Sequence, residues 1–155
     1  MIKRPKILII YGYHPKETFA SKIGEDLFRS FPGSPIQVVK YTGKQDNCHS
    51  TRNLRRFVGK FGPSVLPVVL HNDRKTNTEA IIIYCAKSRQ EKRKMLKSLF
   101  GFVSRYNKKS ISVIFDTILI PNAKHSLVEI EFNPKTDIKK AKNLVRETSK
   151  YLLNI

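Results

Sequence analysis

The chain has 155 residues, and its 30 Lys and Arg against 12 Asp and Glu give a formal net charge of +18. Hydrophobic residues make up 40% of it, which is typical of a globular protein and excludes a disordered chain. No apolar run is long enough to span a bilayer, and the start, MIKRPKILII, is too short and strand-like for a signal peptide. We therefore expect a cytoplasmic protein of one domain, residues 1–155, that has no membrane partner.

The excess of basic residues limits the partners of this chain. A strongly positive field attracts anions, which include nucleic acid, phosphorylated metabolites and acidic substrates. A lysine-rich surface is also typical of thermophilic proteins, but those surfaces usually balance Lys with Glu. A functional excess and a thermophilic surface both stay open from composition alone.

Apolar runs typical of strands alternate along the chain with amphipathic patterns typical of helices. We expect strands at 6–11, 36–41, 65–70, 80–85, 110–115 and 127–132, helices at 18–31, 90–103 and 139–153, and a short helix or loop at 53–57. This alternation predicts an α/β fold, a three-layer sandwich around a mixed, partly parallel central sheet of the phosphorylase/hydrolase-like type.

Three details of these elements can be tested against the structure. Pro67 cannot donate a ladder hydrogen bond, so it indicates that 65–70 is an edge strand or carries a bulge. The continuous apolar run AIIIYC, 80–85, indicates a strand buried on both faces. In the helix 90–103, the residues expected to face inward are Leu96, Leu99, Phe100 and Val103.

Three side chains with metal-binding chemistry follow predicted strands. His14 and Glu17 come just after the first strand, and His71 closes the third. Since the carboxyl ends of parallel strands share one edge of a sheet, these three are expected to meet. Catalytic Zn²⁺ commonly takes two histidines and a carboxylate and keeps one position for water. The alternative is an ordinary polar loop and a strand-end histidine that bonds to a loop backbone.

Two glutamates are candidates for a general base, which would take a proton from water. Glu129 and Glu131 alternate along the strand 127–132, so they point to the same face. Burying two acids on an apolar strand is costly without a partner, and a metal site or basic cluster would supply one. Either glutamate could be the base, and a solvated sheet face is the alternative.

Four short stretches resemble the zinc carboxypeptidase clan, in its aspartoacylase and succinylglutamate desuccinylase branch. YGYHPKE, 11–17, resembles strand-G-x-H-G-N-E, and LHNDRKTN, 70–77, is similar to L-H-N-T-T-x-N. TRNLRRF, 51–57, looks like D-L-N-R-x-F, and VEIEFNP, 128–134, is similar to T-V-E-V-G-P. The family has an Asp two residues before its second zinc histidine, where this chain has Val69.

The resemblance implies a zinc-dependent hydrolase of an amide or ester bond, of carboxypeptidase or acylase type, acting on an anionic small molecule or peptide. It places Zn²⁺ on His14, Glu17 and His71 and the general base on Glu131, with Glu129 as the near alternative. Asn53 and one arginine would hold a substrate carboxylate; the arginine is Arg52, Arg55 or Arg56.

Two other kinds of protein remain open. The basic segments 52–60, 87–97 and 139–150, with aromatics nearby, are compatible with a nucleic-acid-binding protein that has no catalytic activity. A degenerate hydrolase scaffold that serves as a partner subunit is the third interpretation. Cys48 beside His49 invites a thiol nucleophile but nothing orients the pair, and Cys85 is expected in the core. Oligomeric state and substrate identity are left open.

Overall fold

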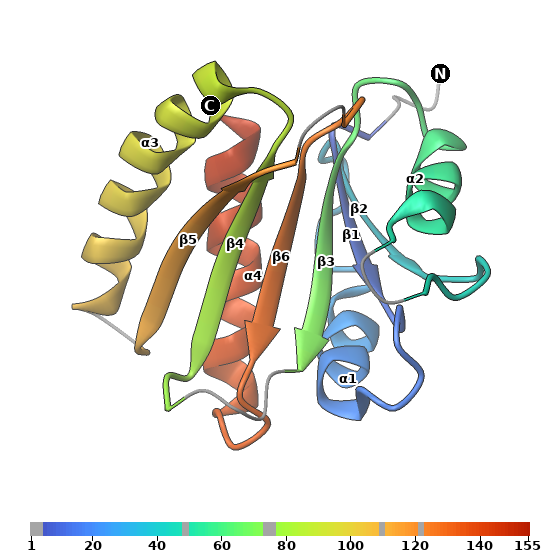
Figure 1. Ribbon diagram of the computed structural model, residues 1–155. Helices are drawn as coiled ribbons and strands as arrows, with labels where there is room; N and C mark the ends of the chain where they lie inside the picture. The colour runs from blue at the N-terminus through green and yellow to red at the C-terminus, as the bar shows by residue number, and fades with distance from the viewer. Residues whose placement is uncertain (1–4, 48–49, 73–76, 109–110, 121–122) are drawn as a thin grey trace.

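Figure 1 shows the computed structural model of the chain, which describes residues 5–47, 50–72, 77–108, 111–120 and 123–155. The strands are β1 (Ile7–Tyr11), β2 (Ile36–Lys40), β3 (Leu66–Asn72), β4 (Ala80–Ala86), β5 (Val113–Leu119) and β6 (Leu127–Phe132). The helices are α1 (Thr18–Leu27), α2 (Arg52–Gly59), α3 (Arg89–Asn107) and α4 (Ile138–Leu153). None of the described helices is both long and apolar enough to cross a membrane.

The six strands form one mixed sheet in the order β2-β1-β3-β6-β4-β5. β1 pairs in parallel with β2 and β3, and β3 pairs in parallel with β6. β4 runs antiparallel to β6 and parallel to β5. The carboxyl ends of β3 and β6 therefore lie at the lower edge of the sheet in Figure 1, where β4 and β5 begin.

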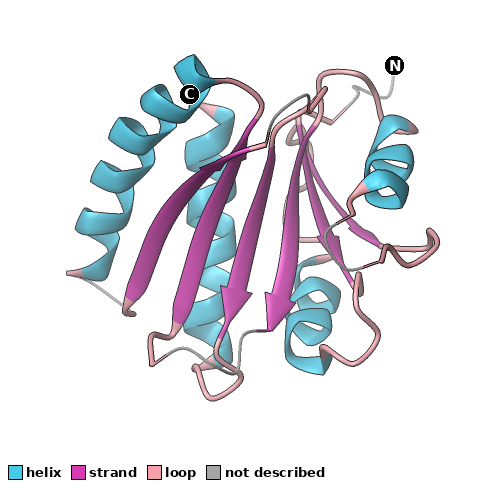
Figure 2. Ribbon diagram, viewed as in Figure 1, coloured by secondary structure: helices cyan, strands magenta, loops and turns pink. Residues whose placement is uncertain are grey.

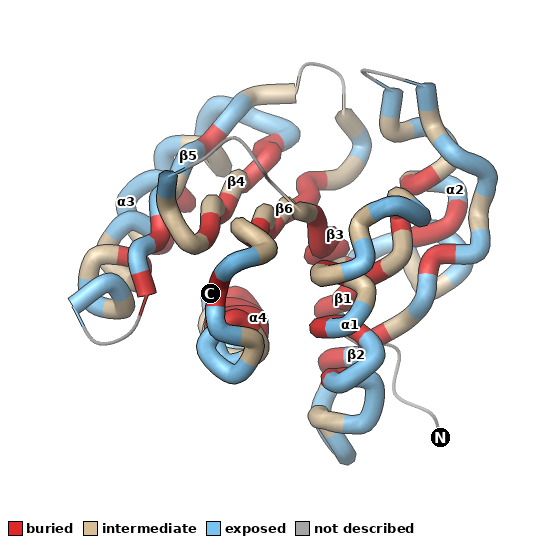
Figure 3. The backbone as a smooth tube through the Cα atoms, turned by 90° about the horizontal axis from the view of Figure 1, so that it is seen from below, coloured by how far each residue is buried: buried red, intermediate tan, exposed pale blue. Residues whose placement is uncertain are grey.

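Two hydrophobic clusters lie on opposite faces of the sheet. The larger one packs α1, α3 and α4 against one face. The smaller one packs Leu54, Phe57 and Val58 of α2 against the other face, over β1 and β3. Figures 2 and 3 show this arrangement, with α2 the one described helix on its side. The expected α/β sandwich with a mixed central sheet is confirmed, and its second helical layer is partial.

The prediction that the strand with Pro67 is an edge or carries a bulge is wrong. β3 is central, between β1 and β6. The Leu66 N–H donates to the Lys6 carbonyl on the β1 side, at 2.9 Å. The next nitrogen, that of Pro67, faces β6, where pairing begins only at Val68 with Val128. The missing donor therefore costs no ladder hydrogen bond.

Two predictions of burial are wrong in part. In α3 the buried stripe is Met95, Leu99 and Val103, while Leu96 and Phe100 are 49% and 60% exposed. In β4, Ile81 and Ile83 are only half-buried, because no described helix covers this part of β4 on that face, while Cys85 on the same face is buried.

Several boundaries differ from those expected. α1 ends at Leu27, and β5 begins at Val113. Ser110, which the sequence placed at the start of that strand, lies outside the described residues. The segment expected as a short helix or loop is the two-turn helix α2, and β6 has the predicted bounds.

Candidate metal centre

A tight turn after β1 carries the first two candidate ligands. Gly12 has a φ of 70°, a left-handed conformation that glycine adopts without steric cost, so the chain turns sharply there. The Glu17 N–H donates to the His14 carbonyl at 3.1 Å, which closes one turn just before α1. The two side chains therefore lie at the carboxyl end of β1.

His71 reaches the same place from the end of β3. One ligand atom from each of His14, Glu17 and His71 lies within 4.8 Å of the other two. Nδ1 of His71 is 3.2 Å from Oε2 of Glu17, and the rings of the two histidines have centroids 5.2 Å apart. Tetrahedral zinc with ligands at 2.0–2.2 Å needs ligand atoms about 3.4 Å apart. Two imidazoles and a carboxylate at these separations fit such an ion.

The electrostatics around His71 favour a cation. Its side chain is nearly buried, at 7% exposure for the residue. Burial alone would lower the pKa of His71, but the hydrogen bond and charge of Glu17, with the charges of Glu129 and Glu131, raise it above its ordinary value. The same carboxylate charges would also favour a metal ion that replaces the proton on this imidazole.

Both candidate bases lie on the face of the sheet that carries His71. Glu131 is the register partner of His71, and Glu129 is the partner of Val69, two residues before it. Oε1 of Glu129 lies 3.9 Å from Nε2 of His71. The carboxylate that the resemblance expects at Val69 is thus supplied from the neighbouring strand.

Sequence reasoning missed two residues that support the ligand turn. The ring of Tyr13 lies 4.6 Å from that of His14 and 5.7 Å from that of His71, between centroids. Its hydroxyl donates to Oδ2 of Asp46 at 2.7 Å. Burial and then this hydrogen bond raise the pKa of Tyr13. Nothing in the local sequence marks Asp46, because its contact with the ligand turn is made by Tyr13, 33 residues earlier in the chain.

Asp46 also joins the ligand turn to α2. Its carboxylate accepts from the backbone N–H groups of Asn53 at 2.8 Å and Leu54 at 3.0 Å, in the first turn of the helix. Unpaired N–H groups at a helix start are normally satisfied by the cap residue. Thr51 holds that position, but its side chain makes no capping hydrogen bond, so Asp46 supplies the acceptor from outside the helix.

The four residues of α2 that were expected to bind substrate lie in different environments. Arg55 donates to the Thr51 hydroxyl at 3.0 Å and to the His125 carbonyl at 2.7 Å, which ties α2 to the loop before β6. Asn53 donates to the Gln45 carbonyl at 3.2 Å. Arg52 and Arg56 are exposed. The guanidinium of Arg55 is therefore already engaged away from the ligand cluster.

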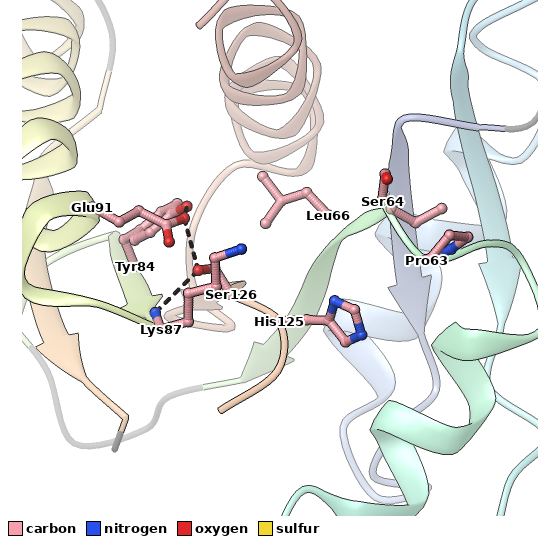
Figure 4. Close-up of a pocket in the computed structure, with 9 residues that line it drawn as sticks. Pro63, Ser64, Leu66, Tyr84, Lys87, Glu91, His125 and Ser126 are labelled. Carbon is pink, nitrogen blue, oxygen red and sulfur yellow. Dashed lines mark hydrogen bonds between the residues drawn. The ribbon is translucent and has the colours of Figure 1, made fainter. Parts of the chain in front are cut away.

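A cavity of about 330 Å³ lies at the opposite end of the sheet, where β4 ends and β6 begins. Figure 4 shows its polar wall: the Tyr84 hydroxyl donates to Glu91, and Ser126 Oγ donates to Oε1 of Glu91 at 2.7 Å. Ser126 Oγ accepts from the Lys87 N–H at 3.1 Å. This network joins α3 to the end of β4 and the start of β6 and is separate from the candidate ligands.

No family model matches the sequence, and no curated protein matches it. Among solved structures, the chain is similar to the N-acetylmuramoyl-L-alanine amidase from Clostridium difficile 630, with a TM-score of 0.57 and 13% identity over 98% of this chain and 97% of that chain. It is also similar to a candidate metallopeptidase from Shewanella baltica OS155, with a TM-score of 0.50 and 14% identity over 96% and 76% of the two chains. This chain therefore has a hydrolase-like α/β fold, and the ligand cluster lies at the carboxyl edge of its sheet.

Proposed function

We propose that this protein is a zinc-dependent hydrolase of an amide or ester bond, of the carboxypeptidase or acylase type. The observation that carries the proposal is the convergence of His14, Glu17 and His71 to within 4.8 Å at the carboxyl edge of the sheet. The names of the structural neighbours, an amidase and a candidate metallopeptidase, support a peptide-like substrate.

Each residue of the cluster has a role in this proposal. His14, Glu17 and His71 hold the ion, which supplies a Lewis acid that polarises a carbonyl and makes water more acidic. Glu131, beside His71 in the register, accepts the proton of the attacking water and returns it to the leaving amine. Glu129 faces the second nitrogen of His71 and orients the ring.

The substrate carries an anionic group that binds at α2. Arg52 begins this helix and Arg56 lies one turn later, and both are exposed. Asp46 links the first turn of α2 to Tyr13, next to His14, so the helix start is close to the ligand turn. A guanidinium there binds a carboxylate in a two-pronged hydrogen bond and fixes the orientation of the substrate.

The test is hydrolysis of a panel of N-acyl amino acids and short peptides by the zinc-loaded chain. Glu131→Gln removes the base and keeps the shape, so its kcat should fall about 10²–10⁴-fold. Glu147→Gln is the matched control, since Glu147 lies on α4 with its side chain 46% exposed, and it should retain full activity. Hydrolysis of no substrate by the loaded chain, or full activity in Glu131→Gln, would contradict the proposal.

A second candidate function is nucleic-acid binding, which the net charge of +18 favours. The first turns of α3 expose a basic surface that includes Arg89, Arg93, Lys94 and Lys97. Binding of this kind weakens steeply with salt, because each neutralised phosphate releases counterions. Duplex and single-stranded binding that falls with salt but survives chelation and His14→Ala would support this function over hydrolysis.

A further inference from the structure

One half of the sheet face next to the metal cluster has no described helix over it. We call this half the open face; its residues are Ile81 and Ile83 of β4, Ile114, Asp116 and Ile118 of β5, and Glu129 and Glu131 of β6. Ile114 and Ile118 are 47% and 42% exposed, which is high for two isoleucines on one face of the same strand. Exposed apolar surface of this kind commonly marks a binding site.

The open face is continuous with the candidate metal centre. The register places His71, Glu131, Ile81 and Ile114 side by side across four strands. Adjacent strands lie about 4.8 Å apart, so this row extends about 14 Å from the ligand cluster. Figure 1 shows the strands concerned, β3, β6, β4 and β5, in that order. A substrate bound at the metal can therefore lie across them.

The next row carries charge. It consists of Val69, Glu129, Ile83 and Asp116 in register. Asp116 is exposed, and one of its oxygens accepts the N–H of Thr117 at 2.7 Å, which holds the carboxylate close to the strand. Two strand spacings separate Asp116 from Glu129, about 10 Å. Carboxylates thus lie on both sides of the half-buried Ile83.

The sign of this charge is opposite to that of the whole protein. The chain has 30 basic and 12 acidic residues, yet the open face as defined holds three carboxylates and no Lys or Arg. A surface that alternates isoleucine with carboxylate complements a ligand that has aliphatic carbon and positive charge. An anionic ligand would instead be repelled there.

We propose that the open face binds the part of the substrate beyond the scissile bond, and that this part contains an aliphatic side chain and a lysine or arginine. The proposal rests on the hydrolase function above, whose anion-binding residues lie on α2, which packs over β1 and β3 and not over the open face. An extended peptide advances about 3.3–3.6 Å per residue, so the cationic residue lies two or three positions from the scissile bond. Its ammonium or guanidinium group lies beside Asp116, which is exposed on β5.

The experiment measures binding of three labelled octapeptides that alternate leucine with lysine, norleucine or glutamate. Fluorescence anisotropy is recorded in 0.15 M salt with the full chain, as wild type and as His14→Ala, which lacks a candidate ligand and lies off the open face. We expect the lysine peptide to bind at least tenfold more tightly than the glutamate peptide, against the overall charge of +18. Equal binding, or tighter binding of the glutamate peptide, would overturn the proposal.

A matched pair of charge reversals locates the binding surface. Asp116→Lys should weaken binding of the lysine peptide at least tenfold. Glu147→Lys reverses a charge on α4, which packs on the opposite side of the sheet, and should change binding less than twofold. Equal effects of the two reversals would show an unspecific charge effect and overturn the proposal. A chain that is dimeric by light scattering, and that Ile118→Lys makes monomeric, would also overturn it, since a second copy would then cover this face.

Failure of this inference and failure of the hydrolase function give different results. Hydrolysis of all three peptides at equal kcat/KM leaves the function intact and overturns the inference. Preference for the lysine peptide in binding, with hydrolysis of none by the zinc-loaded chain, supports the open face and overturns the function.

Discussion

Glu129 and His71 face each other across neighbouring strands, with 3.9 Å between Oε1 of Glu129 and Nε2 of the imidazole. The other nitrogen of the ring, Nδ1, lies 3.2 Å from Glu17. One nitrogen is therefore available to the ligand cluster while the other faces a carboxylate. In the proposed metal centre, this arrangement would orient His71 and increase its basicity. Glu131, the register partner of His71, is then the base that we propose for the chemical step.

We predict that the two glutamates differ in what they control. Glu129→Gln should weaken zinc affinity about 10–100-fold, because His71 loses its orienting carboxylate. Glu131→Gln should keep the zinc affinity within about threefold and lose most of kcat. Zinc titration against a fluorescent chelator and steady-state kinetics measure the two quantities. The reverse pattern, with metal lost in Glu131→Gln only, would exchange the two roles.

The ionised carboxylate of Asp46 should stabilise the fold at pH values above its pKa. Its pKa lies below the ordinary value: burial would raise it, but bonds from the Tyr13 hydroxyl and the N–H groups of Asn53 and Leu54 lower it. A lowered folded pKa gives stability that is present above the unfolded value, 3.8, and is lost as pH falls through the folded value. Asp46→Ala should therefore lose about 1 kcal/mol at pH 7 and much less at pH 2.5.

Urea unfolding at the two pH values measures this difference, with Glu147→Gln as the control. An equal loss for Asp46→Ala at both values would show that its charge has no part in holding the ligand turn to α2.

Glu91 should be structural. It accepts from Tyr84 and Ser126 at the far end of the sheet, and its own N–H donates to Ser88 Oγ at the start of α3. Glu91→Ala leaves a buried hydroxyl without its charged acceptor, so the free energy of unfolding should fall by about 2 kcal/mol. The zinc content per folded chain should not change. A loss of metal in this variant would connect the two ends of the sheet.

Cys85 should be inert in the native protein. The residue is 3% exposed, and burial first, then the charge of Glu129, raises the pKa of its thiol to about 12. Because the thiolate is the reactive form, a thiol reagent at pH 8 should label at most one of the two cysteines, Cys48, until the chain is denatured. Cys48 lies outside the described residues. Rapid labelling of native Cys48→Ser would contradict this.

The sequence was most informative where the pattern is local. The bounds of β6 and the mixed α/β architecture follow from apolar runs of strand length between helical patterns. The proximity of His14, Glu17 and His71 follows from the rule that parallel strands end at one edge. Their binding of a metal stays a prediction.

The features that the sequence did not predict depend on contacts between distant segments. The register of β6 against β3, not the spacing of its glutamates, brings Glu129 to His71. Phe100 is exposed because the helix packs through Met95, Leu99 and Val103, one of two apolar stripes that the pattern allows. Arg55 bonds to a carbonyl 70 residues further along the chain, which no local motif indicates.

The most direct test of a metal site is the zinc content of the purified chain, measured by plasma mass spectrometry after dialysis against a weak chelator. We predict about one zinc per wild-type chain, lost in both His14→Ala and His71→Ala and retained in Glu147→Gln. A wild-type chain without metal after zinc is added back, or equal zinc in wild type and the histidine variants, would contradict the assignment of this cluster as a metal centre.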